Sequence, residues 1–178
     1  MKLFPILLLL IVCPRAAGAG DGGTIFGTWS FDPSRSTDLA IWKSLTPRLV
    51  ISGTAEVITI RTLWMEGKNV RWADSATVRA GGPPVTQPAT SAIWPDNWFM
   101  GVLTKKGAPL TVSALWRTPG TALDVTATRI VEVSQGDAAT TTIREMRVDS
   151  TGSTLNVLER RSARPTPVRL VFQRVLTP

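Results

Sequence analysis

Side-chain character alternates with a period of two residues over much of this sequence, and this alternation restricts its fold more than any other feature. The pattern is clearest within residues 56–64, where one set of alternate positions holds Ile58, Ile60, Thr62 and Trp64. Aromatic and β-branched residues suit a pleated, half-buried surface. The segment therefore predicts a β-strand with one face turned toward the protein interior.

Segments of the same kind recur along the chain, and turn sequences that contain glycine separate many of them. Further strands are predicted at residues 48–52, 69–78, 98–104, 110–116, 122–133, 140–148, 154–161 and 168–175. The turns fall at residues 66–69, 105–107, 119–120, 135–137 and 149–152, where glycine permits the positive φ angles of tight turns. Many strands joined by short turns indicate an antiparallel sandwich or barrel.

Two stretches interrupt this pattern. Residues 33–47 carry a partial helical stripe of apolar side chains and are predicted to form one short helix or an ordered loop. Residues 81–88 are rich in glycine and proline, which do not suit a central strand, and are predicted to form a long surface loop.

The first residues have the composition of a secretory signal. Lys2 precedes an apolar run at residues 3–12, and small residues follow at 16–20. We expect cleavage after Ala19, with residues 1–19 as signal peptide and 20–178 as one secreted or periplasmic domain. Lipid attachment at Cys13 is the alternative, for which Val12 is a poor preceding residue. The apolar run is too short to span a bilayer of about 30 Å, so no integral membrane span is expected.

Composition excludes several kinds of chemistry. The chain has no histidine and its single cysteine is Cys13, which excludes a Ser-His-Asp hydrolase and a histidine-ligated metal. No phosphate-binding loop or dinucleotide motif is present. No spacing pairs two carboxylates across a cleft among Asp74, Asp96, Asp124, Glu132, Glu145 and Glu159. Three of them have a nearby arginine and are predicted to lie on solvated strand faces, namely Glu132 with Arg129, Glu145 with Arg147 and Glu159 with Arg160. We therefore expect no enzyme activity, no cofactor and no metal.

The formal net charge of +7 falls to +5 if Lys2 and Arg15 are removed with the signal. This charge would favour a weak contact with an anionic envelope surface, or it serves solubility alone. The densest basic cluster comprises Arg160, Arg161, Arg164 and Arg169. Export argues against a nucleic-acid partner for it. It is predicted to form a water-facing edge, with an anionic glycan or lipid head group as the alternative partner.

One motif carries a family resemblance. Gly27-Thr28-Trp29 is followed by Asp32-Pro33-x-x-Ser36. Near the end of the chain, residues 142–157 have the pattern Thr-Ile-Arg-x-x-Arg-Val-x-x-x-Gly-x-x-Leu-x-Val. This order resembles the lipocalin (calycin) superfamily, and in particular exported bacterial lipocalin-like proteins that begin Gly-Thr-Trp-x-x-Asp-Pro-x-x-Ser. The resemblance implies a single antiparallel up-and-down β-barrel of about 8–10 strands. It also implies that Trp29 closes one barrel end beneath a late-strand basic residue, for which Arg174 is the matching position.

Seven tryptophans are present, and burial in the core is the default expectation for each. The alternative is that several line a cavity, since an eight-stranded barrel can hold one small ligand. The candidate ligand-lining residues are Trp64, Trp72, Trp98 and Trp116. Trp94 and Trp98 flank residues 95–97, a predicted turn at the barrel mouth.

These observations favour an exported, non-catalytic carrier or sensor of a small apolar or aromatic ligand. The alternative is an envelope structural or protein-interaction domain whose barrel core is filled, and an enzyme is a distant third. The inner volume of the barrel separates the first two. An apolar cavity of a few hundred Å³ supports ligand binding, whereas a centre packed with Trp and Leu leaves surface recognition only.

Overall fold

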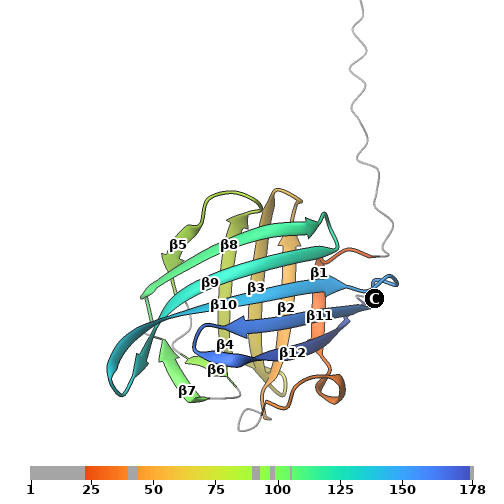
Figure 1. Ribbon diagram of the computed structural model, residues 1–178. Coiled ribbons are helices and arrows are strands. Elements are labelled where there is room, and N and C mark those ends of the chain that lie inside the picture. Colours follow the sequence, from red (N-terminus) through yellow and green to blue (C-terminus); the bar gives the residue numbers. More distant parts are fainter. Residues whose placement is uncertain (1–22, 40–43, 90–92, 97–98, 105, 177–178) are drawn as a thin grey trace, which may run out of the picture.

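The computed structural model describes residues 23–39, 44–89, 93–96, 99–104 and 106–176. Within this part of the chain, twelve strands form one sheet that is wound into a barrel (Figure 1). Their bounds are β1 Gly27–Phe31, β2 Thr46–Gly53, β3 Val57–Glu66, β4 Asn69–Arg79, β5 Val85–Pro88, β6 Ile93–Asp96, β7 Phe99–Thr104, β8 Pro109–Thr118, β9 Ala122–Val133, β10 Gly136–Val148, β11 Thr154–Arg161 and β12 Arg164–Arg174.

The topology confirms the predicted all-β, antiparallel barrel. The wall runs in the order β4-β3-β2-β1-β12-β11-β10-β9, and β8 pairs with the free side of β9. Most neighbours in this wall are also consecutive in sequence, as an up-and-down arrangement requires. The first and last strands lie side by side, because β1 pairs with β12 in antiparallel register.

The barrel is nearly closed, and its thinnest junction lies between β4 and β8. There the wall is joined by an isolated bridge between Ala80 and Ala114, with the Gly81 amide donating to the Ala114 carbonyl at 2.7 Å. Short strand β5 pairs with β8 beside this bridge, and the Gln87 side-chain amide donates to the Ser75 carbonyl of β4. We call this junction the β4–β8 seam.

Two predicted connections contain strands. Residues 81–88 were expected to form a loop, yet β5 occupies Val85–Pro88 and pairs with β8. Strand β6 takes up part of the predicted turn after Trp94, with a register shift at Pro95. Both prolines lie where a missing amide donor is tolerated, Pro88 at a strand end and Pro95 at an irregularity. Residues 97–98 and 40–43 lie outside the described part of the chain.

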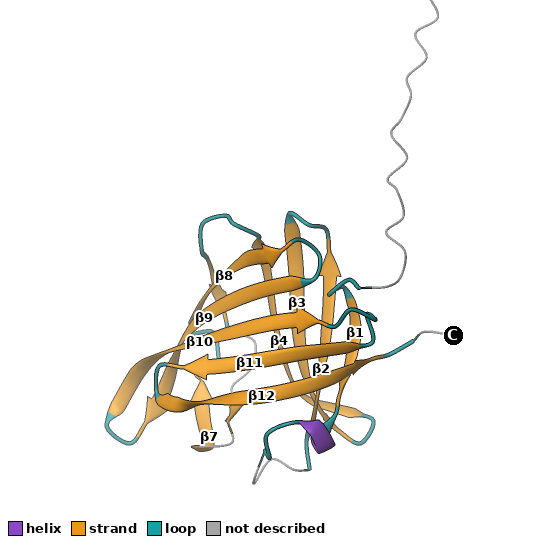
Figure 2. Ribbon diagram, turned by 45° about the vertical axis from the view of Figure 1, so that its right-hand side comes forward, coloured by secondary structure: helices purple, strands orange, loops and turns teal. Residues whose placement is uncertain are grey.

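The stretch after β1 begins with the 3-10 helix η1, Pro33–Arg35, at the lower barrel end in Figure 2. Asp32 caps it, since its carboxylate accepts from the Ser34 amide at 3.1 Å. Strand β2 follows at Thr46, so the expected short helix is limited to these three residues within the described part. No helix in that part is long and apolar enough to cross a membrane.

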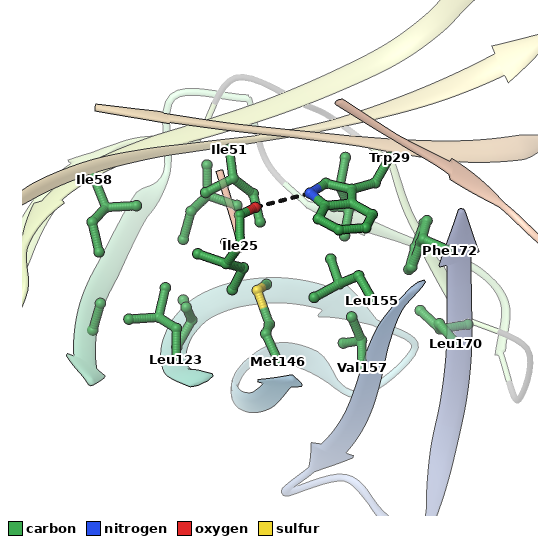
Figure 3. Packing of buried hydrophobic residues seen from close by; sticks show 14 of the residues in the cluster. Ile25, Trp29, Ile51, Ile58, Leu123, Met146, Leu155, Val157, Leu170 and Phe172 are labelled. Atoms are coloured by element: carbon green, nitrogen blue, oxygen red, sulfur yellow. Dashed lines mark hydrogen bonds between the residues drawn. The ribbon is translucent and has the colours of Figure 1, made fainter. Parts of the chain in front are cut away.

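Apolar side chains from most strands of the wall form one buried cluster inside the barrel (Figure 3). Trp29 has no exposed surface, and its indole nitrogen donates to the Ile25 carbonyl at 2.9 Å. The side chains of Leu123 on β9, Met146 on β10 and Leu155 on β11 lie below it in this view and belong to the same buried cluster. The alternation seen in the sequence thus supplies one apolar stripe per strand to a shared interior.

Candidate functional site

Arg174 covers the buried Trp29 ring at one end of the barrel. Its guanidinium carbon lies 4.2 Å from the centroid of the Trp29 ring. The same guanidinium donates to three backbone carbonyls, those of Gly152 at 2.6 Å, Phe26 at 2.8 Å and Thr24. The contact expected between these two side chains is therefore present, and it ties the segment before β1 to the last strand.

The glycine of the Gly-Thr-Trp motif has a steric reason. Gly27 has a φ of +138°, and a Cβ at this position would lie 2.7 Å from the Nη1 atom of Arg174. The later motif residues join β1 to β12, because the Ser36 hydroxyl donates to the Asp32 carbonyl at 2.6 Å and accepts from the Val171 amide at 2.8 Å. The motif residues thus hold β1 and the segment after it close to β12.

Farther along the same strands the barrel interior changes from apolar to charged. The Arg144 Nε atom lies 2.6 Å from one carboxylate oxygen of Glu159, and Arg161 Nη2 lies 2.6 Å from the other. Arg144 and Glu159 are cross-strand partners on β10 and β11, so both side chains point to the same face. Glu159 is only 2% exposed. Two guanidiniums therefore share one buried carboxylate.

Two further polar contacts cross the interior from wall to wall. Arg144 Nη1 on β10 donates to the Thr62 hydroxyl on β3 at 3.1 Å. Arg129 on β9 forms an ion pair with Asp74 on β4, with 3.0 Å between Nη2 and the carboxylate oxygen. Thr62 and Asp74 are themselves cross-strand partners. We call Thr62, Asp74, Arg129, Arg144, Glu159 and Arg161 the interior charged cluster.

The charge states in this cluster follow from burial and pairing. Burial alone would raise the pKa of Glu159, but the Arg144 and Arg161 guanidiniums outweigh it and lower that pKa to about 2. Burial lowers the pKa of Arg129, and the nearby Asp74 carboxylate opposes this effect. The Glu159 carboxylate is thus ionised at neutral pH.

Two small chambers adjoin the cluster, one on each side of the Thr62–Arg144 contact. The first has a volume of about 20 Å³ and is lined by Trp64, Val157, Leu170, Glu159 and Arg161 among others. The second has a volume of about 40 Å³ and lies between β4 and β8, with Asp74 and Arg129 in its lining. Each has room for about one water molecule. Around the cluster, the described side chains therefore leave little free space.

A larger pocket lies at the barrel mouth beside η1. Its volume is about 370 Å³, and it is lined by Phe31, Pro33, Ser36, Thr37, Asp38, Leu39, Leu45 and Thr46. Leu39, which is 8% exposed, also lines the first interior chamber. This leucine therefore separates the mouth pocket from the charged cluster.

The predicted ligand-lining tryptophans differ in position. Trp64 lines the first chamber and is 9% exposed. Trp72 faces it across the β3–β4 ladder but is half-buried and lines none of these three pockets. Trp116 donates from its indole nitrogen to the Ala55 carbonyl at 2.7 Å and packs edge-on against Phe26, away from the pockets. Trp98 lies outside the described residues.

The prediction of a basic surface needs correction at one residue. Arg160 is exposed and pairs with Glu145 at 2.9 Å, Arg169 is exposed, and Arg164 is half-buried. Arg161 instead is buried and points inward to Glu159. The interpretation of Glu159 and Arg160 as one solvated face is also wrong, because consecutive residues of a strand point to opposite faces.

The sequence also contains a pattern that indicates the interior charged cluster. Period-two parity places Glu159 and Arg161 on the same face as Leu155 and Val157, which are buried. The same parity places Arg144 with Met146 and Arg129 with Leu123. Charged side chains at these positions interrupt apolar stripes that point inward.

Among the described residues, no group of three or more His, Cys, Asp or Glu side chains could hold a metal ion.

The chain matches no protein-family model and no curated protein sequence. Solved structures with the same fold include a fatty acid transporter described as REP1-NXSQ, with a TM-score of 0.50 and 11% identity, covering 86% of this chain and 97% of that one. A Schistosoma mansoni fatty acid binding protein in complex with arachidonic acid gives a TM-score of 0.51 and 13% identity, covering 88% and 100%. The chain therefore has the same kind of antiparallel barrel fold as these two proteins.

Proposed function

We propose that this protein is an exported, non-catalytic carrier of a small apolar ligand, which enters the barrel at the mouth beside η1. The observation that carries the proposal is the interior charged cluster beneath the mouth pocket. Buried ion pairs are often no more stabilising than well-packed apolar residues of similar volume. Three arginines and two carboxylates inside a barrel are therefore better explained by a ligand than by stability.

The mouth pocket supplies room for the ligand. Its volume of about 370 Å³ falls in the range of small-molecule sites. Leu39 lines both this pocket and the first chamber, so rotation of its side chain would join the two. The ligand body then lies at the mouth and one end reaches Arg144 and Glu159. The similar structures are named for fatty acids, which supports a hydrocarbon chain as the apolar part.

The charge state of the buried carboxylate supports a non-catalytic role. A general acid or base works best with a pKa near the working pH. The pKa of Glu159 is held at about 2 by Arg144 and Arg161, so this carboxylate neither gives nor takes a proton near neutrality. Export rests on the composition of residues 1–19, which have the charged start, apolar run and small-residue site of a signal peptide.

Native mass spectrometry of the protein purified from its own host tests ligand carriage directly, and a co-purified mass is the expected result. Uptake of 1-decanol is then measured by calorimetry on the wild type and on Leu39→Trp, which fills the passage. We expect Leu39→Trp to weaken binding by about tenfold or more. Leu115→Trp, on the exposed outer face of β8, is the matched control and should bind as the wild type does. No bound mass and no uptake would reject the proposal.

A second function is favoured by a specific observation. The interior chambers, at about 20 and 40 Å³, are far smaller than a ligand cavity. A barrel that keeps this filled interior would act through its surface, as an envelope structural or interaction domain. In that case decanol uptake is absent in wild type and both variants, while the protein remains folded.

A further inference from the structure

The arginine pair of the interior charged cluster is already occupied by a carboxylate of the chain itself, that of Glu159. Glu159 accepts from Arg144 Nε at 2.6 Å and from Arg161 Nε at 2.8 Å, and all three residues line the first chamber. A further nitrogen of Arg144, Nη1, donates a hydrogen bond to the Thr62 hydroxyl. The chain thus satisfies its own arginine pair.

A second carboxylate placed in this chamber would share the site with Glu159. Two carboxylates that share a site repel each other, and one of them can stay ionised only at a large energetic cost. Glu159 does not yield its negative charge easily, because two guanidiniums hold it ionised. The repulsion therefore falls on the incoming ligand.

A hydroxyl group meets the same surroundings differently. An ionised carboxylate only accepts hydrogen bonds, whereas a hydroxyl both donates and accepts. A ligand hydroxyl can donate to a Glu159 oxygen and accept from a guanidinium N–H of Arg144. A carboxylate ligand can do only the second. The chemistry of the chamber thus discriminates between two ligands that differ only in their head groups.

We propose that Glu159 is a specificity-determining residue, which makes the barrel select a neutral, hydroxyl-bearing lipid in preference to a fatty acid. This inference rests on the proposed carrier function and adds the class of head group. It assigns to Glu159 a role that its burial alone would not require. Arg161 acts with it by holding the carboxylate in place.

The test compares calorimetric affinities for 1-decanol and decanoate at neutral pH, using protein expressed from the full-length sequence. The wild type should prefer decanol by about tenfold or more. Glu159→Gln should shift the ratio toward decanoate by at least the same factor. The double variant Glu159→Gln with Arg161→Gln keeps the net charge of the cluster unchanged and should also shift the ratio toward decanoate. This result would show that the preference depends on the occupation of Arg144 by Glu159 and not on the net charge of the cluster.

Glu145→Gln is the matched control, because it removes one carboxylate from the outer face of the same sheet. It should leave the ratio unchanged. The inference is overturned if the wild type binds decanoate as tightly as decanol, or if a folded Glu159 variant keeps the wild-type ratio. If neither variant folds, the wild-type ratio alone decides. Binding of neither compound by the wild type contradicts the carrier function itself, which is a different outcome from a wrong preference.

Discussion

Trp29 and Arg174 face each other across the β1–β12 ladder, and the Arg174 guanidinium carbon lies 4.2 Å from the centroid of the indole ring. The cation lies over a ring with no exposed surface, an arrangement whose attraction increases as water is excluded. Because the two residues lie on β1 and β12, their contact joins the first strand of the barrel to the last. We propose that this pair closes the barrel end.

Trp29→Ala should destabilise the protein by about 3–5 kcal/mol, because it leaves a cavity as well as removing apolar contacts. Chemical denaturation monitored by circular dichroism gives the free energy of unfolding. Trp116→Ala is the comparison, since that side chain is partly exposed at the edge of the core and should cost less. Equal unfolding free energies for Trp29→Ala and wild type would exclude the end-closing role.

Arg174→Ala should be coupled energetically to Trp29→Ala. A double-mutant cycle is expected to give a non-additive term of about 0.5–3 kcal/mol, because side chains in contact do not act independently. The same cycle run with Trp72→Ala in place of Trp29→Ala should be additive. If the Trp29 and Arg174 effects simply add, the contact contributes nothing to stability.

Gly27→Ala should destabilise the barrel by roughly 1–3 kcal/mol, as expected for a side chain in a positive-φ conformation. Its φ is +138° and the new Cβ would press on Arg174 Nη1. Gly136→Ala has a comparable φ of +115° and open space around it, so it serves as the control for backbone strain alone. Thermal melts should show a larger loss for Gly27→Ala. Equal losses would show that Arg174 moves aside freely.

Glu159 should make stability depend on pH in the acid range. Its pKa is about 2 in the folded protein against an ordinary 4.5, so its ionised form favours folding. This contribution is complete above about pH 4.5 and is lost as pH falls toward 2. Glu159→Gln should destabilise by about 3–5 kcal/mol near pH 7, since it leaves the buried Arg161 and the half-buried Arg144 without their carboxylate. The gap to wild type should narrow on acidification.

Urea denaturation of both proteins at a series of pH values measures this gap. Asp149 also has a pKa of about 2, where burial, which raises it, is outweighed by hydrogen bonds such as that from the Thr154 amide. Asp149→Asn is therefore the control, because it removes a carboxylate of similar pKa from a turn and leaves the barrel interior unchanged. A gap that stays constant down to about pH 2 would contradict the assignment of Glu159.

The secreted chain should begin at Gly20, because residues 1–19 carry the parts of a signal peptide in the correct order. Amino-terminal sequencing and intact mass of the product recovered from the host decide the matter. Retention of Met1 on the exported product would reject cleavage after Ala19. A mass increase of two acyl chains at Cys13 would support lipid attachment instead.

Most of the barrel could be predicted from the sequence because one face of each antiparallel strand is buried. Arg174 has the same period-two parity as Phe172, which is buried, and its contact with Trp29 agrees with an inward position. Strands β5 and β6 were missed because they are short and contain proline, and their pairing depends on distant strands.

The interior charged cluster was harder to predict for a physical reason. Glu159 and Arg161 have the parity of buried positions, but a charged residue is almost never fully buried unless it is paired. Its partner Arg144 lies on another strand, and that pairing requires the β10–β11 register. Sequence alone gives the face of each strand but not the register that brings opposite charges together.

The barrel wall should open locally more easily at the β4–β8 seam than at its long ladders. Most neighbouring strands of the wall are joined by long antiparallel ladders, such as β9–β10 and β3–β4, in which many hydrogen bonds must break together. At the seam the backbone link is the isolated Ala80–Ala114 bridge with the hydrogen bond from the Gly81 amide. Regions with few shared hydrogen bonds open at lower free energy than the rest of a domain. Amide exchange should therefore be faster at Gly81 than along β10 and β11. The second chamber lies between these strands, so transient opening of the seam would admit solvent to Asp74 and Arg129 without unfolding the barrel.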